Sequence, residues 1–124
     1  MKESGANVGL VKIPVSDFER ATAYYREGLG LEEQFAVAEY GWAQYATGYL
    51  PLCLYTVGLG GGSGTPGGDS GIHLAVPDAA ALHARLTERG LSGLGEVHTS
   101  DEGDSFFDVT DPDGNVLKIT GAST

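Results

Sequence analysis

The sequence predicts an α+β fold built from two βαβββ modules, and two observations lead to this prediction. The first is an internal repeat, in which LVKIPVSD at residues 10–17 matches GIHLAVPD at residues 71–78, close to half a chain apart. The second is the pattern after each copy, where a helical segment is followed by three short runs typical of strands. We expect modules at about residues 8–57 and 69–120 of a single 124-residue domain.

Each module is predicted to begin with a strand that runs directly into a helix. Apolar residues alternate along both repeat copies, and each copy closes with an aspartate, Asp17 or Asp78, in position to cap the following helix. Helices are expected over residues 18–27 and 79–89, because apolar residues recur there at helical spacing before glycines stop them. The strands expected after the helices are, in chain order, residues 32–39, 42–47, 50–57, 94–98, 105–110 and 115–120.

A glycine-rich stretch, GLGGGSGTPGGDSG at residues 58–71, joins the two modules. Its composition is typical of a flexible linker. It contains no GxxxxGK[ST] pattern, and its glycines do not open a helix, so we do not expect it to bind phosphate.

Composition and charge narrow the possible functions. The formal net charge is −10 and the few lysines and arginines do not cluster, so nucleic acid is not an expected partner. No apolar run approaches the roughly 18 to 20 residues that cross a bilayer, and the first residues lack a signal peptide's apolar stretch. We therefore expect a cytoplasmic protein without a membrane partner. The single cysteine, Cys53, excludes an internal disulfide and a multi-cysteine metal site.

The chain resembles the vicinal oxygen chelate superfamily, which includes glyoxalase I, the bleomycin-resistance proteins and the extradiol dioxygenases. Two stretches carry the resemblance: VKIPVSDFERATAYYREGLGL, similar to the opening strand and helix of the family, and DPDGNVLKI, similar to its closing turn and strand. The resemblance implies that the modules form a curved, barrel-like mixed sheet with helices on the convex side and a ligand cavity on the concave side. We expect a homodimer, because open sheets have edges that need cover.

The resemblance also implies where metal ligands would stand, and the residues at those positions are unsuitable. The matching positions on the first and last strands of the modules are Leu10, Gly71, Lys118 and, in the first module, Cys53. Leucine and glycine have no ligating side-chain atom, and a protonated lysine repels a cation. His73 lies two residues beyond Gly71, but a lone histidine makes a poor metal site. We therefore expect no metal ligands and no cofactor.

Strand alternation selects the residues that should face the cavity, because the unbroken apolar sets must pack under the helices. The candidates for ligand binding are Leu10, Lys12, His73, Lys118, Trp42 and Tyr45. Trp42 and Tyr45 have opposite parity on one strand, so only one of them can face inward. Two ammonium groups and an imidazole would favour an anionic or carbonyl-bearing ligand, unless the lysines pair with carboxylates such as Glu39 or Asp108. An aromatic wall would suit a planar ring.

Three function classes are compatible with these residues, in decreasing order of preference. The first is a metal-free protein of the bleomycin-resistance type that binds an antibiotic or metabolite in the cavity. The second is a metal-independent lyase or isomerase, in which His73 acts as general acid or base and Lys12 or Lys118 stabilises an oxyanion. The third is a divalent-metal lyase or dioxygenase with rearranged ligands. The sequence leaves open whether the protein is an enzyme.

Overall fold

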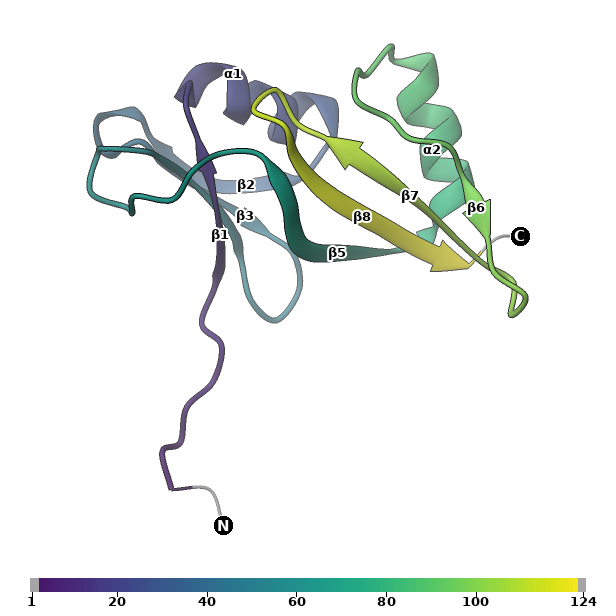
Figure 1. The fold of residues 1–124 in the computed structure, drawn as a ribbon, viewed down its shortest axis with the longest axis horizontal. Helices are drawn as coiled ribbons and strands as arrows, with labels where there is room; N and C mark the ends of the chain where they lie inside the picture. Colours follow the sequence, from purple (N-terminus) through teal and green to yellow (C-terminus); the bar gives the residue numbers. More distant parts are fainter. Residues whose placement is uncertain (1–2, 123–124) are drawn as a thin grey trace.

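The computed structural model describes residues 3–122, which form two four-stranded mixed sheets and two helices (Figure 1). The elements of the first module are β1 (Val11–Val15), α1 (Phe18–Ala23), a π-helical turn η1 (Tyr24–Gly28), β2 (Glu32–Val37), a 3-10 turn η2 (Ala38–Tyr40), β3 (Trp42–Ala46) and β4 (Leu52–Thr56). Those of the second are β5 (Gly68–Asp78), α2 (Ala79–Glu88), β6 (His98–Thr99), β7 (Asp104–Thr110) and β8 (Asn115–Ala122). The predicted α+β fold of two βαβββ modules is thereby confirmed.

The two sheets have the same topology. Their strand orders are β1-β4-β3-β2 and β5-β8-β7-β6, and in each sheet the opening strand runs parallel to the last strand of its module. Both helices begin as the sequence predicts, since Asp17 accepts a hydrogen bond from the Arg20 amide and Asp78 accepts one from the Ala81 amide. Among residues 3–122, no helix is long and apolar enough to cross a membrane.

The second strand of the second module, which directly follows α2, is the element that departs most from expectation. A strand was predicted over residues 94–98, but the structure has only a single bridge from Leu94 to Val109 and the two-residue β6. Gly93 and Gly95 lie against the backbone of β7, where Gly95 donates to the Asp108 carbonyl and Gly93 accepts from the Thr110 amide. Glycines weaken a regular strand, which explains the irregular pairing.

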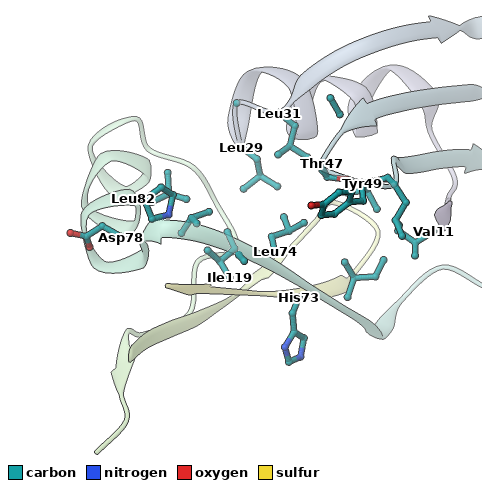
Figure 2. Close-up of a pocket in the computed structure, with 18 of the residues that line it drawn as sticks. Val11, Leu29, Leu31, Thr47, Tyr49, His73, Leu74, Asp78, Leu82 and Ile119 are labelled. Carbon is teal, nitrogen blue, oxygen red and sulfur yellow. Dashed lines mark hydrogen bonds between the residues drawn. The ribbon is translucent and has the colours of Figure 1, made fainter. Parts of the chain in front are cut away.

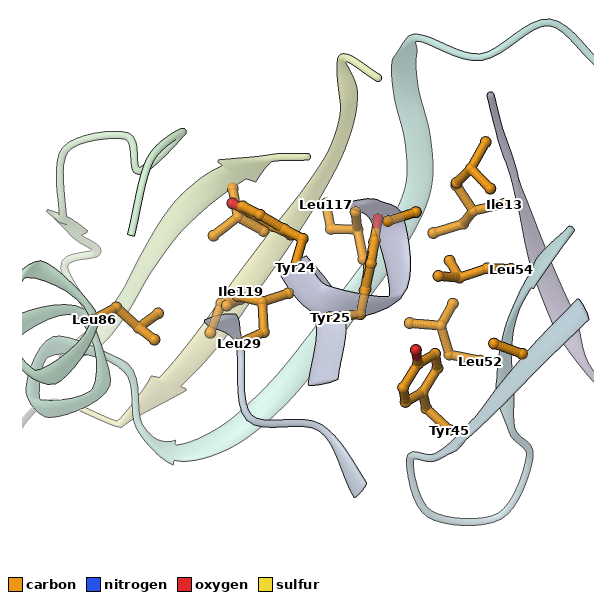
Figure 3. Packing of buried hydrophobic residues seen from close by; sticks show 14 of the residues in the cluster. Ile13, Tyr24, Tyr25, Leu29, Tyr45, Leu52, Leu54, Leu86, Leu117 and Ile119 are labelled. Carbon is orange, nitrogen blue, oxygen red and sulfur yellow. The ribbon is translucent and has the colours of Figure 1, made fainter. Parts of the chain in front are cut away.

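Both sheets turn one face toward a single core, and the helix formed by α1 and its continuation η1 lies between them (Figure 3). Tyr25, in η1, is buried between Ile13 and Leu54 of the first sheet and Leu117 and Ile119 of the second (Figure 3). Because this helix fills the space between the sheets, the sheets are curved but do not close into a barrel within one chain. The other face of each sheet, here called the outer face, is turned away from the core.

The DPDGN turn clamps the two modules together. Its first residue, Asp111, is buried and accepts hydrogen bonds from the Tyr25 hydroxyl at 2.7 Å and from the Asp113 and Asn115 amides at 2.9 Å. The Asn115 side chain in turn donates to the Pro14 carbonyl of β1 at 2.8 Å. The motif that carries the family resemblance is thus a structural junction.

Candidate functional site

The outer face of the first sheet combines aromatic side chains with one cation. Lys12 stands opposite Cys53 in register, and Trp42 stands opposite Tyr55, so strand alternation puts all four on this face. The register thus decides between the two aromatic candidates of β3. Trp42 lies on the outer face, whereas Tyr45 is buried in the shared core, which corrects the prediction that Tyr45 contacts a ligand.

Lys12 has found a partner within the chain. Its Nζ donates to the Gly61 carbonyl at 2.7 Å and lies 4.9 Å from the centre of the Tyr55 ring. The ammonium group is therefore satisfied by a backbone carbonyl of the segment that joins the two modules and by an aromatic face, and not by a carboxylate. Beside it, Cys53 is fully buried, and burial raises the pKa of its thiol.

The outer face of the second sheet carries the other predicted polar residues. His73 stands opposite Lys118, and Lys118 stands opposite Asp108, so the three side chains form a row across β5, β8 and β7. The Lys118 Nζ lies 3.5 Å from Asp108 Oδ1 and 5.0 Å from the centre of the Phe106 ring. Of the two alternatives that the sequence leaves open for Lys118, the structure has the paired one, because the antiparallel register places a carboxylate directly beside it.

His73 and Leu10 are accessible but have few fixed contacts. The His73 ring is exposed and has no hydrogen-bond partner among residues 3–122, so nothing in that part of the chain orients it as a general base. Leu10 directly precedes β1, which follows an extended N-terminal segment (Figure 1), and its side chain is exposed. No hydrogen bond or ion pair within the described chain joins Lys12 to His73 or Lys118.

The positions that carry metal ligands in relatives do not form a metal site here. Across residues 3–122, no three His, Cys, Asp or Glu side chains gather where they could hold an ion. Gly71 has no side chain, Lys118 is already paired with an acid, and Cys53 is buried beneath its neighbours. The residues present do not fit a divalent metal, and we derive no chemistry through one.

A pocket of about 900 Å³ lies on the helix side of the sheets, between the modules (Figure 2). Its lining is largely apolar and comes from both modules, including Leu29, Leu31, Leu74, Leu82 and Ile119. His73 of β5 also borders the pocket, but its ring points away from Leu74 and Ile119 (Figure 2). The ring belongs to the outer face of the second sheet, where His73 stands opposite Lys118.

The repeated modules and the DPDGN junction define a protein of the vicinal oxygen chelate fold. The chain belongs to the Glyoxalase/Bleomycin resistance protein/Dioxygenase superfamily, whose family model matches residues 7–119. No curated protein matches the sequence.

Several solved structures are similar over nearly the whole chain. A superfamily member from Sphaerobacter thermophilus DSM 20745 has 26% identity and a TM-score of 0.77, and the match covers 94% of this chain and 97% of that one. A glyoxalase/bleomycin resistance protein from Streptomyces sp. CB03234 has 30% identity and a TM-score of 0.68, with coverage of 91% and 98%. TnmS3, an antibiotic binding protein from the same Streptomyces, has 29% identity and a TM-score of 0.73, with coverage of 98% and 100%.

Proposed function

We propose that this protein binds a small molecule, an antibiotic or a metabolite, on the outer faces of its sheets and without a metal. The observation that carries the proposal is the chemistry of those faces. Trp42 and Tyr55 place aromatic rings there, with Tyr55 covered by residues 58–67. Lys12 and Lys118 place ammonium groups there that have partners within the chain, and the positions of the family's metal ligands offer no ligand set among residues 3–122. The similarity to an antibiotic binding protein at 29% identity supports this reading.

We further propose that a second copy of the chain completes the site. Within one chain α1 holds the sheets by their inner faces, so each outer face is only half of a cavity. The strands β1 and β5 each end a sheet, and the outer face of the first sheet presents Phe35, which is 46% exposed. A dimer that set the first sheet of one copy against the second sheet of the other would cover these groups and bring Lys12 toward the partner's Lys118.

The oligomeric state can be tested directly. Size-exclusion chromatography with light scattering should give twice the mass of the chain, and the melting temperature should rise with protein concentration. A monomer at all accessible concentrations would contradict the composite site, although it would leave open binding to a single face.

Ligand binding is tested by a thermal-shift screen against cationic antibiotics, aromatic acids and dicarbonyl compounds. A ligand at 100 times its Kd should add about 2.7 kcal/mol to the free energy of unfolding. Elemental analysis should find no stoichiometric divalent metal, and a chelator should leave the melting temperature unchanged. A loss of several degrees that added metal reverses would refute metal-free binding.

A further inference from the structure

The glycine-rich segment between the modules is packed against the outer face of the first sheet. We call residues 58–67 the glycine strap. The Lys12 Nζ holds its Gly61 carbonyl at 2.7 Å, and the Gly64 amide donates to the Tyr55 hydroxyl at 3.1 Å. Tyr55 is only 5% exposed although it points away from the core. The strap is therefore a cover on this aromatic surface.

Only residues without side chains fit this closely against the rings. A Cβ atom on Gly61 would stand 2.7 Å from Tyr55 Cβ and 3.3 Å from Trp42 Cε3. A Cβ atom on Gly62 would stand 2.8 Å from Tyr55 Cε2. Both distances to Tyr55 are too short for real atoms, so the bare backbone of the strap lies directly on the tyrosine. The strap backbone therefore occupies space next to the rings that a flat ligand would need in order to stack on them.

We propose that the strap is a displaceable occupant of the ligand site, and that the ligand replacing it is a planar aromatic molecule with an acceptor oxygen at its edge. This inference rests on the proposed function. The oxygen is required because Lys12 loses the Gly61 carbonyl when the strap leaves, and an ammonium group beneath a ligand needs a new acceptor. The ring is required because Tyr55 and the edge of Trp42 lose the strap backbone that packs against them.

Displacing the middle of the strap breaks only two polar contacts with the sheet. These are the hydrogen bonds to Lys12 and Tyr55, and a ligand of this chemistry replaces the first of them. The ends of the strap stay attached, because the Leu59 amide donates to the Thr56 carbonyl and the Gly67 amide donates to the Asn115 side chain. A chain of glycines also regains much conformational freedom when it is released. Competition between strap and ligand lowers the apparent affinity by the fraction of molecules in which the strap is open.

The test uses Gly61→Val, which adds bulk where the strap meets Tyr55 and Trp42. Gly61 does not have a left-handed backbone, so valine is resisted by packing and not by backbone strain. Ser63→Val is the matched control, because Ser63 is exposed in the same strap. Trp42 is the only tryptophan of the chain, so acrylamide quenching of its fluorescence reports whether the strap is lifted. Circular dichroism verifies that each variant is folded.

Binding is measured by calorimetric titration with 2-naphthoate, and with cyclohexanecarboxylate as the non-planar control. In Gly61→Val, acrylamide should quench the Trp42 fluorescence more readily than in the wild type. This variant should also bind 2-naphthoate at least about threefold more tightly, because the strap no longer competes for the site. Ser63→Val should match the wild type, and cyclohexanecarboxylate should bind every variant more weakly than 2-naphthoate does.

A second variant, Lys12→Met, releases the strap without adding bulk and removes the proposed ligand contact. It should also increase the quenching of Trp42, but it should bind 2-naphthoate more weakly than the wild type. Unchanged quenching in both variants would overturn the strap as a cover, and increased quenching without tighter binding by Gly61→Val would overturn it as a competitor. If the thermal-shift screen then still yields a ligand that binds both variants as tightly as the wild type, the proposed function stands without this inference. If no ligand binds any variant, both fail.

Discussion

Replacing Tyr25 with phenylalanine should destabilise the fold by about 1.5 to 3 kcal/mol, the range for hydrogen bonds to charged groups. The Tyr25 ring is fully buried, and its hydroxyl donates to Asp111 Oδ2 at 2.7 Å. Phenylalanine keeps the ring and its packing and removes only this donor. Asp111 is 4% exposed, so water does not readily replace the lost partner, and the remaining donors all belong to its own turn. The substitution therefore weakens the junction between the modules.

Tyr24 provides a matched control one residue away. Its hydroxyl donates to the uncharged carbonyl of Ser92 at 2.8 Å, so Tyr24→Phe should cost only about 0.5 to 1.5 kcal/mol. Both losses are measured by urea unfolding followed by circular dichroism at one fixed protein concentration, with the slope expected to stay unchanged. Equal losses in the two variants, or a loss below about 0.5 kcal/mol for Tyr25→Phe, would refute the reasoning that the buried carboxylate makes this hydrogen bond strong.

Three further predictions concern the pKa values of the two tyrosines, the buried Cys53 thiol and the pair of Lys118 with Asp108. Burial and the nearby Asp111 raise the pKa of Tyr24 to about 12 and raise that of Tyr25 as well, so their stabilisation is complete below about pH 10 and is lost as the pH climbs through about 12. The unfolding free energy, measured against pH, should fall in that window; a steep fall near neutral pH would contradict this. Cys53 is fully buried with a raised thiol pKa, so Ellman's reagent should label it rapidly only in urea, and rapid labelling of the folded protein would show that the face opens. Asp108→Asn should change the unfolding free energy by less than about 1 kcal/mol, because the pair with Lys118 is partly exposed, yet should tighten 2-naphthoate binding in titration; unchanged affinity would place Lys118 outside the ligand site.

Local patterns in the sequence determined the architecture. Alternating apolar residues define β1 and β5, and the aspartates that close them cap the helices as expected. These signals depend on neighbours within a few residues, so they can be recognised in the sequence without knowledge of the tertiary structure. The same alternation puts Lys12, His73 and Lys118 on faces turned away from the helices, in agreement with the observed register.

Contacts between distant segments were decided only by the tertiary structure. The sequence does not reveal that the helix of α1 and η1 lies between the two sheets. An apolar helix face indicates that the helix is packed against something, but it does not specify whether one sheet or both contact it. The sequence offers Asp108 as a possible partner of Lys118, but whether the lysine is paired depends on the register across the DPDGN turn, which brings together residues ten positions apart. The strap is the clearest case. Its glycine content predicts a flexible segment, but the lack of side chains also permits the backbone to pack closely against Tyr55. Composition alone cannot distinguish a flexible segment from a closely packed one.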